Sequence, residues 1–179
     1  MADGAETANR VAIVLGAARS DGNTASAVAH LSQKLANRVN VADLSVLKVG
    51  LFDYARHDDR DDFRSVIGMM LASEHIVFAT PVYWYSMSGT MKVFFDWLTD
   101  LLEPDNREVG RALAGRSVWL LATGTDDCLP SGFHEPFART AAYFGMVWRQ
   151  AFYSRSVKGG PLTDESLSEA GKLASLIVA

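Results

Sequence analysis

The chain has 179 residues, which is enough for one domain with a buried core. Its formal net charge of -4 gives no overall attraction to nucleic acid or to an anionic membrane, so any anion site has to be built locally. A single cysteine, Cys128, excludes an internal disulfide, an iron–sulfur cluster and a cysteine-rich zinc site, and no apolar run reaches the roughly 18 residues of a membrane span.

Residues 1–9 are small and polar, without the apolar stretch of a secretion signal. We therefore expect a disordered N-terminus over 1–9, followed by one domain over 10–179. The expected location of the protein is the cytoplasm.

Apolar patterning predicts strands and helices that alternate along the chain. Residues 11–15 form a continuous apolar run, as in a strand buried on both faces of a parallel sheet. Val28, Leu31 and Leu35 then recur at helical spacing. In chain order, the predicted elements are a strand at 11–15, a helix at 24–38, a strand at 41–44, a helix at 61–73, a strand at 75–79, a helix at 90–102, a strand at 117–122, a helix at 135–144, a strand at 146–152 and a helix at 163–178.

This alternation is typical of an α/β domain with a parallel sheet. Right-handed strand–helix–strand connections place helices on both faces, which gives an open, doubly wound sheet. Ligands of such sheets bind beyond the carboxyl ends of the strands, where the strand order reverses. The loops that follow the first, third and fourth predicted strands are therefore the candidates for a binding site.

The first of these loops, 16–24, has the features of a phosphate site. Gly16 and Gly22 permit tight turns and close approach of an anion, and the following helix presents unpaired N–H groups and a partial positive charge. No Asp or Glu occurs over 22–42, which leaves room for an external anion. Side-chain donors that surround this point are Arg19, Ser20, Asn23 and Thr24.

The alternative for this loop is an ordinary strand-to-helix turn with a capping residue. It is not a P-loop, because no Gly-Lys-Ser/Thr follows, and Ala18 breaks the dinucleotide-binding Gly-x-Gly-x-x-Gly pattern. ATP binding and primary NAD binding are therefore disfavoured.

The second loop, 80–90, predicts a site for a flat aromatic ligand. Tyr83, Trp84 and Tyr85 are consecutive, so they cannot all point into a core. Small residues near them, Ser86, Ser88 and Gly89, allow backbone amides to approach a planar molecule. An isoalloxazine ring needs both apolar aromatic contacts for its faces and backbone N–H donors for its polar edge. The alternative is an aromatic loop that packs over the sheet end or in a dimer interface.

The third loop, 122–127, offers small residues and hydroxyl donors, as many loops of this class do. Cys128 and His134 follow it and allow a nucleophile pair, although a passive loop thiol is the simpler interpretation. The acidic run 57–62 allows a metal site, although a solvated loop at a helix N-terminus is simpler. We expect structural roles for His30 and His75, and no metal.

Together these segments resemble the NADPH-dependent FMN reductase family of flavodoxin-like oxidoreductases, over about 11–150. The motifs that carry the resemblance are Gly-Ala-Ala-Arg-Ser-Asp-Gly-Asn-Thr at 16–24 and Pro-Val-Tyr-Trp-Tyr-Ser-Met-Ser-Gly-Thr-Met-Lys-Val-Phe-Phe-Asp at 81–96. The resemblance implies a flavodoxin-like, doubly wound, five-stranded parallel sheet with the order 2-1-3-4-5 and helices on both faces. It also implies FMN as cofactor and NADPH or NADH as electron donor.

By the family pattern, 17–24 holds the FMN phosphate, 81–89 holds the ring and the ribityl chain, and 123–125 closes over the other ring edge. The site residues that the resemblance implies are Ala17, Arg19, Asn23, Thr24, Pro81, Val82, Tyr83, Trp84, Tyr85, Ser86, Met87, Gly89, Thr123 and Gly124.

The chain departs from the family pattern at two positions. Ala17 stands where relatives often have Ser, which removes one phosphate hydrogen bond of about 1–2 kcal/mol. Trp97 stands where relatives often have Arg, so an ion pair is replaced by a side chain that could meet a second subunit. With Cys128 as its one cysteine, the chain also lacks the cysteine cluster that some relatives use for iron–sulfur.

The expected function is transfer of electrons from NAD(P)H through bound FMN to a small acceptor, such as a quinone, an azo compound or free flavin. The cofactor carries the redox chemistry, so no side chain is assigned as catalytic. Two alternatives are a flavodoxin-type electron carrier that docks protein partners without NAD(P)H turnover, and a flavin-binding signalling module. We expect a homodimer or homotetramer, with no nucleic acid or membrane partner.

Overall fold

The computed structural model describes residues 11–54, 60–157 and 160–179. The predicted disordered N-terminus and the first half of the acidic run at 57–62 lie outside the described residues. The elements in chain order are β1 Val11–Leu15, α1 Asn23–Leu35, η1 Ala36–Arg38, β2 Val39–Asp43, α2 Arg60–Leu71, β3 His75–Pro81, α3 Gly89–Trp97, η2 Leu98–Leu102, α4 Arg107–Arg111, β4 Ser117–Gly124, α5 Glu135–Tyr143, β5 Val147–Arg155 and α6 Asp164–Ile177.

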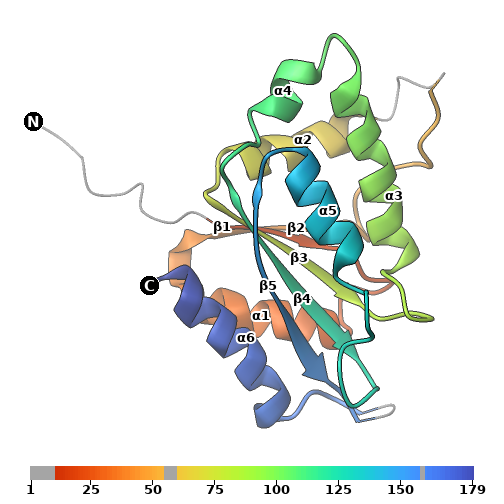
Figure 1. Ribbon diagram of the computed structural model, residues 1–179. Helices are drawn as coiled ribbons and strands as arrows, with labels where there is room; N and C mark the ends of the chain where they lie inside the picture. The colour runs from red at the N-terminus through yellow and green to blue at the C-terminus, as the bar shows by residue number, and fades with distance from the viewer. Residues whose placement is uncertain (1–10, 55–59, 158–159) are drawn as a thin grey trace, which may run out of the picture.

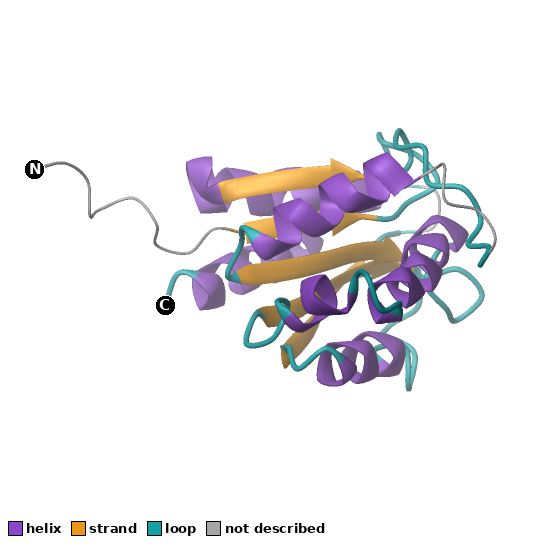
Figure 2. Ribbon diagram, turned by 90° about the horizontal axis from the view of Figure 1, so that it is seen from above, coloured by secondary structure: helices purple, strands orange, loops and turns teal. Residues whose placement is uncertain are grey.

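The five strands form one parallel sheet in the order β2-β1-β3-β4-β5, which confirms the predicted fold class (Figure 1). The chain first builds outward from β1 to β2 and then returns to place β3 on the other side of β1. The order therefore reverses between β1 and β3. Figures 1 and 2 show helices on both faces of the sheet.

Each face of the sheet has its own apolar core. On one face, α1 and α6 pack together over side chains such as Ile13, Val77 and Leu121. On the other, α2, α3 and α5 cover Val14, Phe78 and their neighbours. The central strands are buried along nearly their whole length, which explains their continuous apolar runs.

The predicted elements match the structure closely, with two differences that matter for function. A short helix, α4, was not predicted. In addition, β3, β4 and β5 continue two to three residues past their predicted ends at 79, 122 and 152. All three extensions are at the carboxyl ends of the strands.

The suggestion that Trp97 meets a second subunit is wrong. Its side chain is 1% exposed, and its Nε1 donates a hydrogen bond to the Gly50 carbonyl at 2.6 Å. The ring of Phe52 packs edge-on against it, with centroids 5.4 Å apart. The segment after β2 thus folds across α3 and covers this tryptophan within the same chain.

Among the described residues, no helix is long and apolar enough to cross a membrane.

Candidate functional site

A cavity of about 180 Å³ lies at the carboxyl ends of the strands, where the strand order reverses. Loops after β1, β3 and β4 surround it, together with the residue that follows β5. Its lining residues are Ala17, Ala18, Arg19, Gly22, Asn23, Thr24, Pro81, Val82, Tyr83, Thr123, Gly124, Thr125 and Ser156.

The N-terminus of α1 opens toward this cavity without a side-chain cap. Gly22 occupies the cap position with extended backbone, and the first turn contains no acidic residue. The side chains that could cap the helix bond elsewhere, since Asn23 Nδ2 donates to the Gly160 carbonyl at 3.1 Å and Thr24 Oγ1 bonds to Thr123 Oγ1 at 2.6 Å. Unpaired N–H groups and the helix dipole are therefore available to an anion.

Arg19 lies beside this helix end and is available to a ligand. A Cβ placed on Gly22 would be 3.6 Å from Arg19 Nη2, so the guanidinium lies next to the cap position. Its side chain is 74% exposed, and its contact with Asp21 is a loose 3.7 Å. Exposed pairs of this kind contribute little, so an incoming phosphate can displace the carboxylate.

Buried hydroxyl groups form the floor of this region. Thr24 and Thr123 are each 3% exposed, and their mutual hydrogen bond ties α1 to the end of β4. Ser154 pairs with Thr123 in the β4–β5 register, is fully buried, and its Oγ has no hydrogen-bond partner among the described residues. Polar side chains thus replace the apolar core at the end of the sheet.

The loop after β3 is a tight turn with unusual residues. Tyr83 and Ser86 exchange two backbone hydrogen bonds of 2.9 and 3.0 Å, and Trp84 and Tyr85 between them have φ angles of 48° and 65°. Two positive φ values define a type I′ turn, which normally contains Asn, Asp or Gly. Bulky residues in this conformation store strain, and such strain is concentrated at functional sites.

This turn displays two aromatic side chains to solvent. Trp84 is 94% exposed and Tyr85 is 71% exposed, whereas Tyr83 is half-exposed and lines the cavity. Neither Trp84 nor Tyr85 therefore packs over the sheet end of its own chain. The rim of the cavity is aromatic on this side.

Ser88 holds the aromatic turn in place. Its Oγ donates to the Gly16 carbonyl at 2.7 Å and accepts from Met91 N, which caps α3. Its backbone N–H donates to Thr80 Oγ1 at 3.1 Å. A Cβ on Gly16 would lie 2.7 Å from Met91 Cβ, so only glycine lets the first loop approach α3 this closely.

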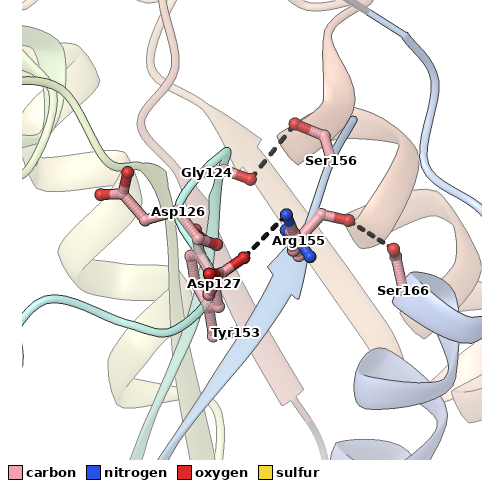
Figure 3. Close-up of polar contacts among 7 residues, drawn as sticks. All are labelled: Gly124, Asp126, Asp127, Tyr153, Arg155, Ser156 and Ser166. Carbon is pink, nitrogen blue, oxygen red and sulfur yellow. Dashed lines mark hydrogen bonds and ion pairs between the residues drawn. The ribbon is translucent and has the colours of Figure 1, made fainter. Parts of the chain in front are cut away.

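The end of β5 holds the third loop, as Figure 3 shows. Ser156 N donates to the Gly124 carbonyl at 2.7 Å, and Tyr153 Oη donates to the Asp126 carbonyl at 3.0 Å. Arg155 forms an ion pair with Asp127 at 2.7 Å. Burial raises the pKa of Tyr153, and the charge of the Asp126 carboxylate raises it further, while the hydrogen bond to the Asp126 backbone and the charge of Arg155 lower it. The pKa is raised on balance, so the phenol remains a donor.

The structure brings nine of the fourteen expected site residues to the cavity: Ala17, Arg19, Asn23, Thr24, Pro81, Val82, Tyr83, Thr123 and Gly124. Trp84, Tyr85 and Ser86 lie on the adjoining turn, Gly89 begins α3, and the Met87 side chain packs in the core. Sequence reasoning missed Tyr153, Arg155 and Ser156, because no local motif marks them.

The other chemical groups suggested by the sequence lie apart from this arrangement. Cys128 is exposed, whereas the His134 ring stacks on Trp148 at 6.1 Å between centroids and lies 3.8 Å from Glu135. Over the described ranges, no group of three or more His, Cys, Asp or Glu side chains could hold a metal ion.

The residues at the cavity fit a flavin mononucleotide. The uncapped end of α1 and Arg19 suit a phosphate monoester, and the half-exposed Tyr83 lines the same cavity and suits a flat ring. Parallel sheets of this strand order bind FMN at this point in flavodoxin. The fold and the cavity therefore define a flavodoxin-like protein.

Comparison with known proteins identifies the family. The chain belongs to the NADPH-dependent FMN reductase family, whose sequence model matches residues 9–128. YwqN of Bacillus subtilis (strain 168), named as an NAD(P)H-dependent FMN-containing oxidoreductase, is 25% identical over 177 residues, covering 92% of this chain and 96% of that protein. The protein is accordingly an NAD(P)H-dependent oxidoreductase with FMN as cofactor.

Solved structures share the fold. The Trp repressor binding protein of Bacillus subtilis has a TM-score of 0.70 and 24% identity, covering 92% of this chain and 97% of that one. An FMN-dependent NADH-azoreductase from Bacillus anthracis, in complex with FMN, has a TM-score of 0.64 and 10% identity, covering 96% of this chain and 100% of that one.

Proposed function

We propose that the protein passes electrons from NADPH or NADH through FMN to a small acceptor, such as a quinone, an azo compound or free flavin. The proposal rests mainly on the N-terminus of α1, which has no side-chain cap and no acidic residue in its first turn. This helix end and Arg19 both border the cavity at the point where the strand order reverses. The azoreductase among the structural neighbours supports acceptors of this class.

In this proposal, Arg19, Asn23, Thr24 and the backbone from Ala17 hold the phosphate. Nearer the mouth, the ring and the ribityl chain contact residues of the second and third loops, which are Pro81, Val82, Tyr83, Trp84, Tyr85, Ser86, Met87, Gly89, Thr123 and Gly124. FMN supplies hydride and single-electron chemistry when it is bound. The chain binds and orients the reactants and lets them reach the ring through an open mouth.

The test begins with the visible spectrum of the purified protein after FMN addition and desalting. We expect bands of bound oxidised flavin, and then rapid NADPH or NADH oxidation that depends on a quinone or an azo dye. Bound flavin without such turnover would favour the electron carrier instead. Absence of bound flavin would contradict the proposed site.

We also propose that the protein is a homodimer or homotetramer that uses the surface of α3, η2, α4 and α5. Two hollows of about 360 and 330 Å³ share Leu102, Tyr143 and Phe144. Tyr143 is 70% exposed and separates them, so a two-fold contact would insert this ring into the partner's hollow. Arg107 and Arg111 line the larger hollow, and Arg111 forms an ion pair with Glu108 at 2.6 Å.

The oligomer proposal is tested by analytical ultracentrifugation. Tyr143→Lys should give a monomer that still binds FMN, whereas Tyr54→Lys, at a tyrosine that is 74% exposed elsewhere, should leave the assembly unchanged. A Tyr143→Lys protein that sediments like the unaltered protein would exclude this surface. The cytoplasmic location stays a prediction.

A further inference from the structure

The β4–α5 loop borders the candidate cofactor site, yet it has little structure of its own. Gly124 and Thr125 line the cavity, while regular structure resumes only at Glu135, where α5 begins. Asp127 is 88% exposed and Cys128 is exposed. A loop of this kind needs contacts from another element to stay in one position.

One short stretch of β5 supplies these contacts. Ser156 binds the Gly124 carbonyl with both its N–H and its Oγ, at 2.7 and 3.2 Å. Tyr153 Oη holds the Asp126 carbonyl, and the Arg155 guanidinium holds the Asp127 carboxylate (Figure 3). The last residue of β4 and two of the three loop residues after it are thus held by three residues at the end of β5.

The end of β5 has contacts of its own with α6 and with the end of β4. Ser166 in the first turn of α6 donates its hydroxyl to the Arg155 carbonyl (Figure 3). The Tyr153 ring lies directly under Gly124, because a Cβ there would be 2.7 Å from the phenol oxygen. The strand end is therefore held by β4 and by α6, whereas the loop residues Asp126 and Asp127 depend on their contacts with the strand end.

We propose that Tyr153, Arg155 and Ser156 form a latch that holds the loop 124–127 closed against bound FMN, so that release of this loop sets the rate at which FMN leaves. The proposal rests on the proposed FMN site. Tyr153 and Arg155 are positioning residues, because they act through the loop, whereas Ser156 also lines the cavity. Tyr153 is the main holder, since the Arg155–Asp127 pair is largely exposed and screened by solvent.

The test measures exchange of bound FMN against isotopically labelled FMN in the holoprotein, followed by mass spectrometry. Tyr153→Phe keeps the ring under Gly124 and removes only the hydroxyl. Loss of one hydrogen bond of ordinary net strength corresponds to release that is about fivefold faster. Arg155→Gln should accelerate release about twofold, because it breaks the ion pair with Asp127. The double variant Asp127→Lys, Arg155→Glu exchanges the two charges and should return the release rate to that of the unaltered protein.

Matched controls lie away from the cavity. Tyr54→Phe removes another phenol hydroxyl, and Lys172→Gln breaks the exposed ion pair with Glu169 on α6. Neither should change the release rate. If Tyr153→Phe and its double variant with Arg155→Gln release FMN at the control rate, the latch is excluded while the FMN site stands.

Hydrogen exchange of the apoprotein provides a readout that needs no cofactor. Tyr153→Phe should speed amide exchange over 125–128 and leave the sheet unchanged. Unchanged exchange in this segment would also overturn the latch. If the unaltered protein retains no FMN, the proposed function fails, and the latch on the cofactor fails with it.

Discussion

The two ends of the same sheet are built differently. At the amino ends of the strands, polar groups find partners within the chain: Trp119 Nε1 donates to His75 Nδ1 at 3.2 Å, and Arg116 Nε donates to the Met70 carbonyl at 3.1 Å at the end of α2. At the carboxyl ends, a helix start is uncapped, the buried Ser154 hydroxyl has no hydrogen-bond partner within the described part of the chain, and aromatic rings face solvent.

This contrast indicates that a ligand binds at the carboxyl ends of the strands. A buried polar group that lacks a partner costs about 1–3 kcal/mol, so a folded chain normally pairs it. The amino end follows this rule at the positions named, whereas the carboxyl end leaves several interactions incomplete. In the proposed site, FMN would supply a partner for the uncapped N-terminus of α1 and cover the Tyr83 ring, and mutations at the two ends should therefore affect different properties.

The largest expected effect is on cofactor affinity. Arg19→Ala should raise the FMN dissociation constant about 10- to 100-fold, because hydrogen bonds to charged groups contribute about 1.5–3 kcal/mol. The free energy of unfolding should change by less than about 0.5 kcal/mol, since Arg19 is 74% exposed. Calorimetry and urea unfolding measure the two quantities.

The control for this variant is Arg38→Ala, at an exposed arginine beyond the other end of α1. It should change neither quantity. Equal FMN affinity in the Arg19 and Arg38 variants would remove Arg19 from the phosphate site and weaken the contrast between the two ends.

A smaller effect is expected for the buried hydroxyl groups beside the cavity. Substitutions there should change both the FMN affinity and the free energy of unfolding. Thr24→Val removes the 2.6 Å bond to Thr123 and leaves that hydroxyl buried without it, at a cost of about 1–3 kcal/mol of unfolding free energy. FMN affinity should fall as well. Thr24→Ser retains the hydroxyl and should restore most of both; a valine variant as stable as the unaltered protein would contradict this account.

The smallest expected effect concerns pH and the amino end. Burial lowers the pKa of His75, Glu74 raises it, and Arg149 lowers it. Since the net pKa in the folded state lies below the 6.5 of the unfolded chain, the unfolded state binds more protons as the pH falls below 6.5. Stability is therefore fully present above pH 6.5 and is lost as the pH falls through the folded-state pKa.

Urea unfolding between pH 5 and 7 checks this, with His75→Gln as the comparison, which should flatten the slope. FMN affinity should show no dependence on His75, because the side chain lies at the end of the sheet opposite to the cavity. A change in affinity with this substitution would mean that the two ends are coupled.

Local patterns allowed most of the fold to be predicted, and nine of the fourteen expected site residues line the cavity. The apolar run 11–15 and the helix start after Gly22, which lacks acidic residues, are close together in the sequence. The phosphate site could therefore be predicted from the single loop that joins them. The strand ends were placed too early because their side chains become polar at the cavity: Thr80, Thr123 and Ser154 are buried hydroxyls that interrupt the apolar signal. Polar composition there reflects the site rather than the end of the strand.

The rest depended on contacts between distant segments. Tyr153 and Arg155 reach the third loop only because β5 lies beside β4 in a fixed register, with a shift at Val118 and Trp119. The prediction that Trp97 meets a second subunit failed for the same reason. Its side chain is covered by Gly50 and Phe52, which precede α2 and β3 in the sequence. No periodicity within α3 indicates this cover.

The type I′ turn after β3 has a consequence for protein engineering. A designer who optimised heat resistance alone would choose Trp84→Asn and Tyr85→Gly, because those residues adopt left-handed backbone angles without strain. The redesigned hairpin would tolerate higher temperatures, but it would present no indole or phenol surface at the entrance. In this loop, thermal robustness and the display of aromatic surface are competing objectives.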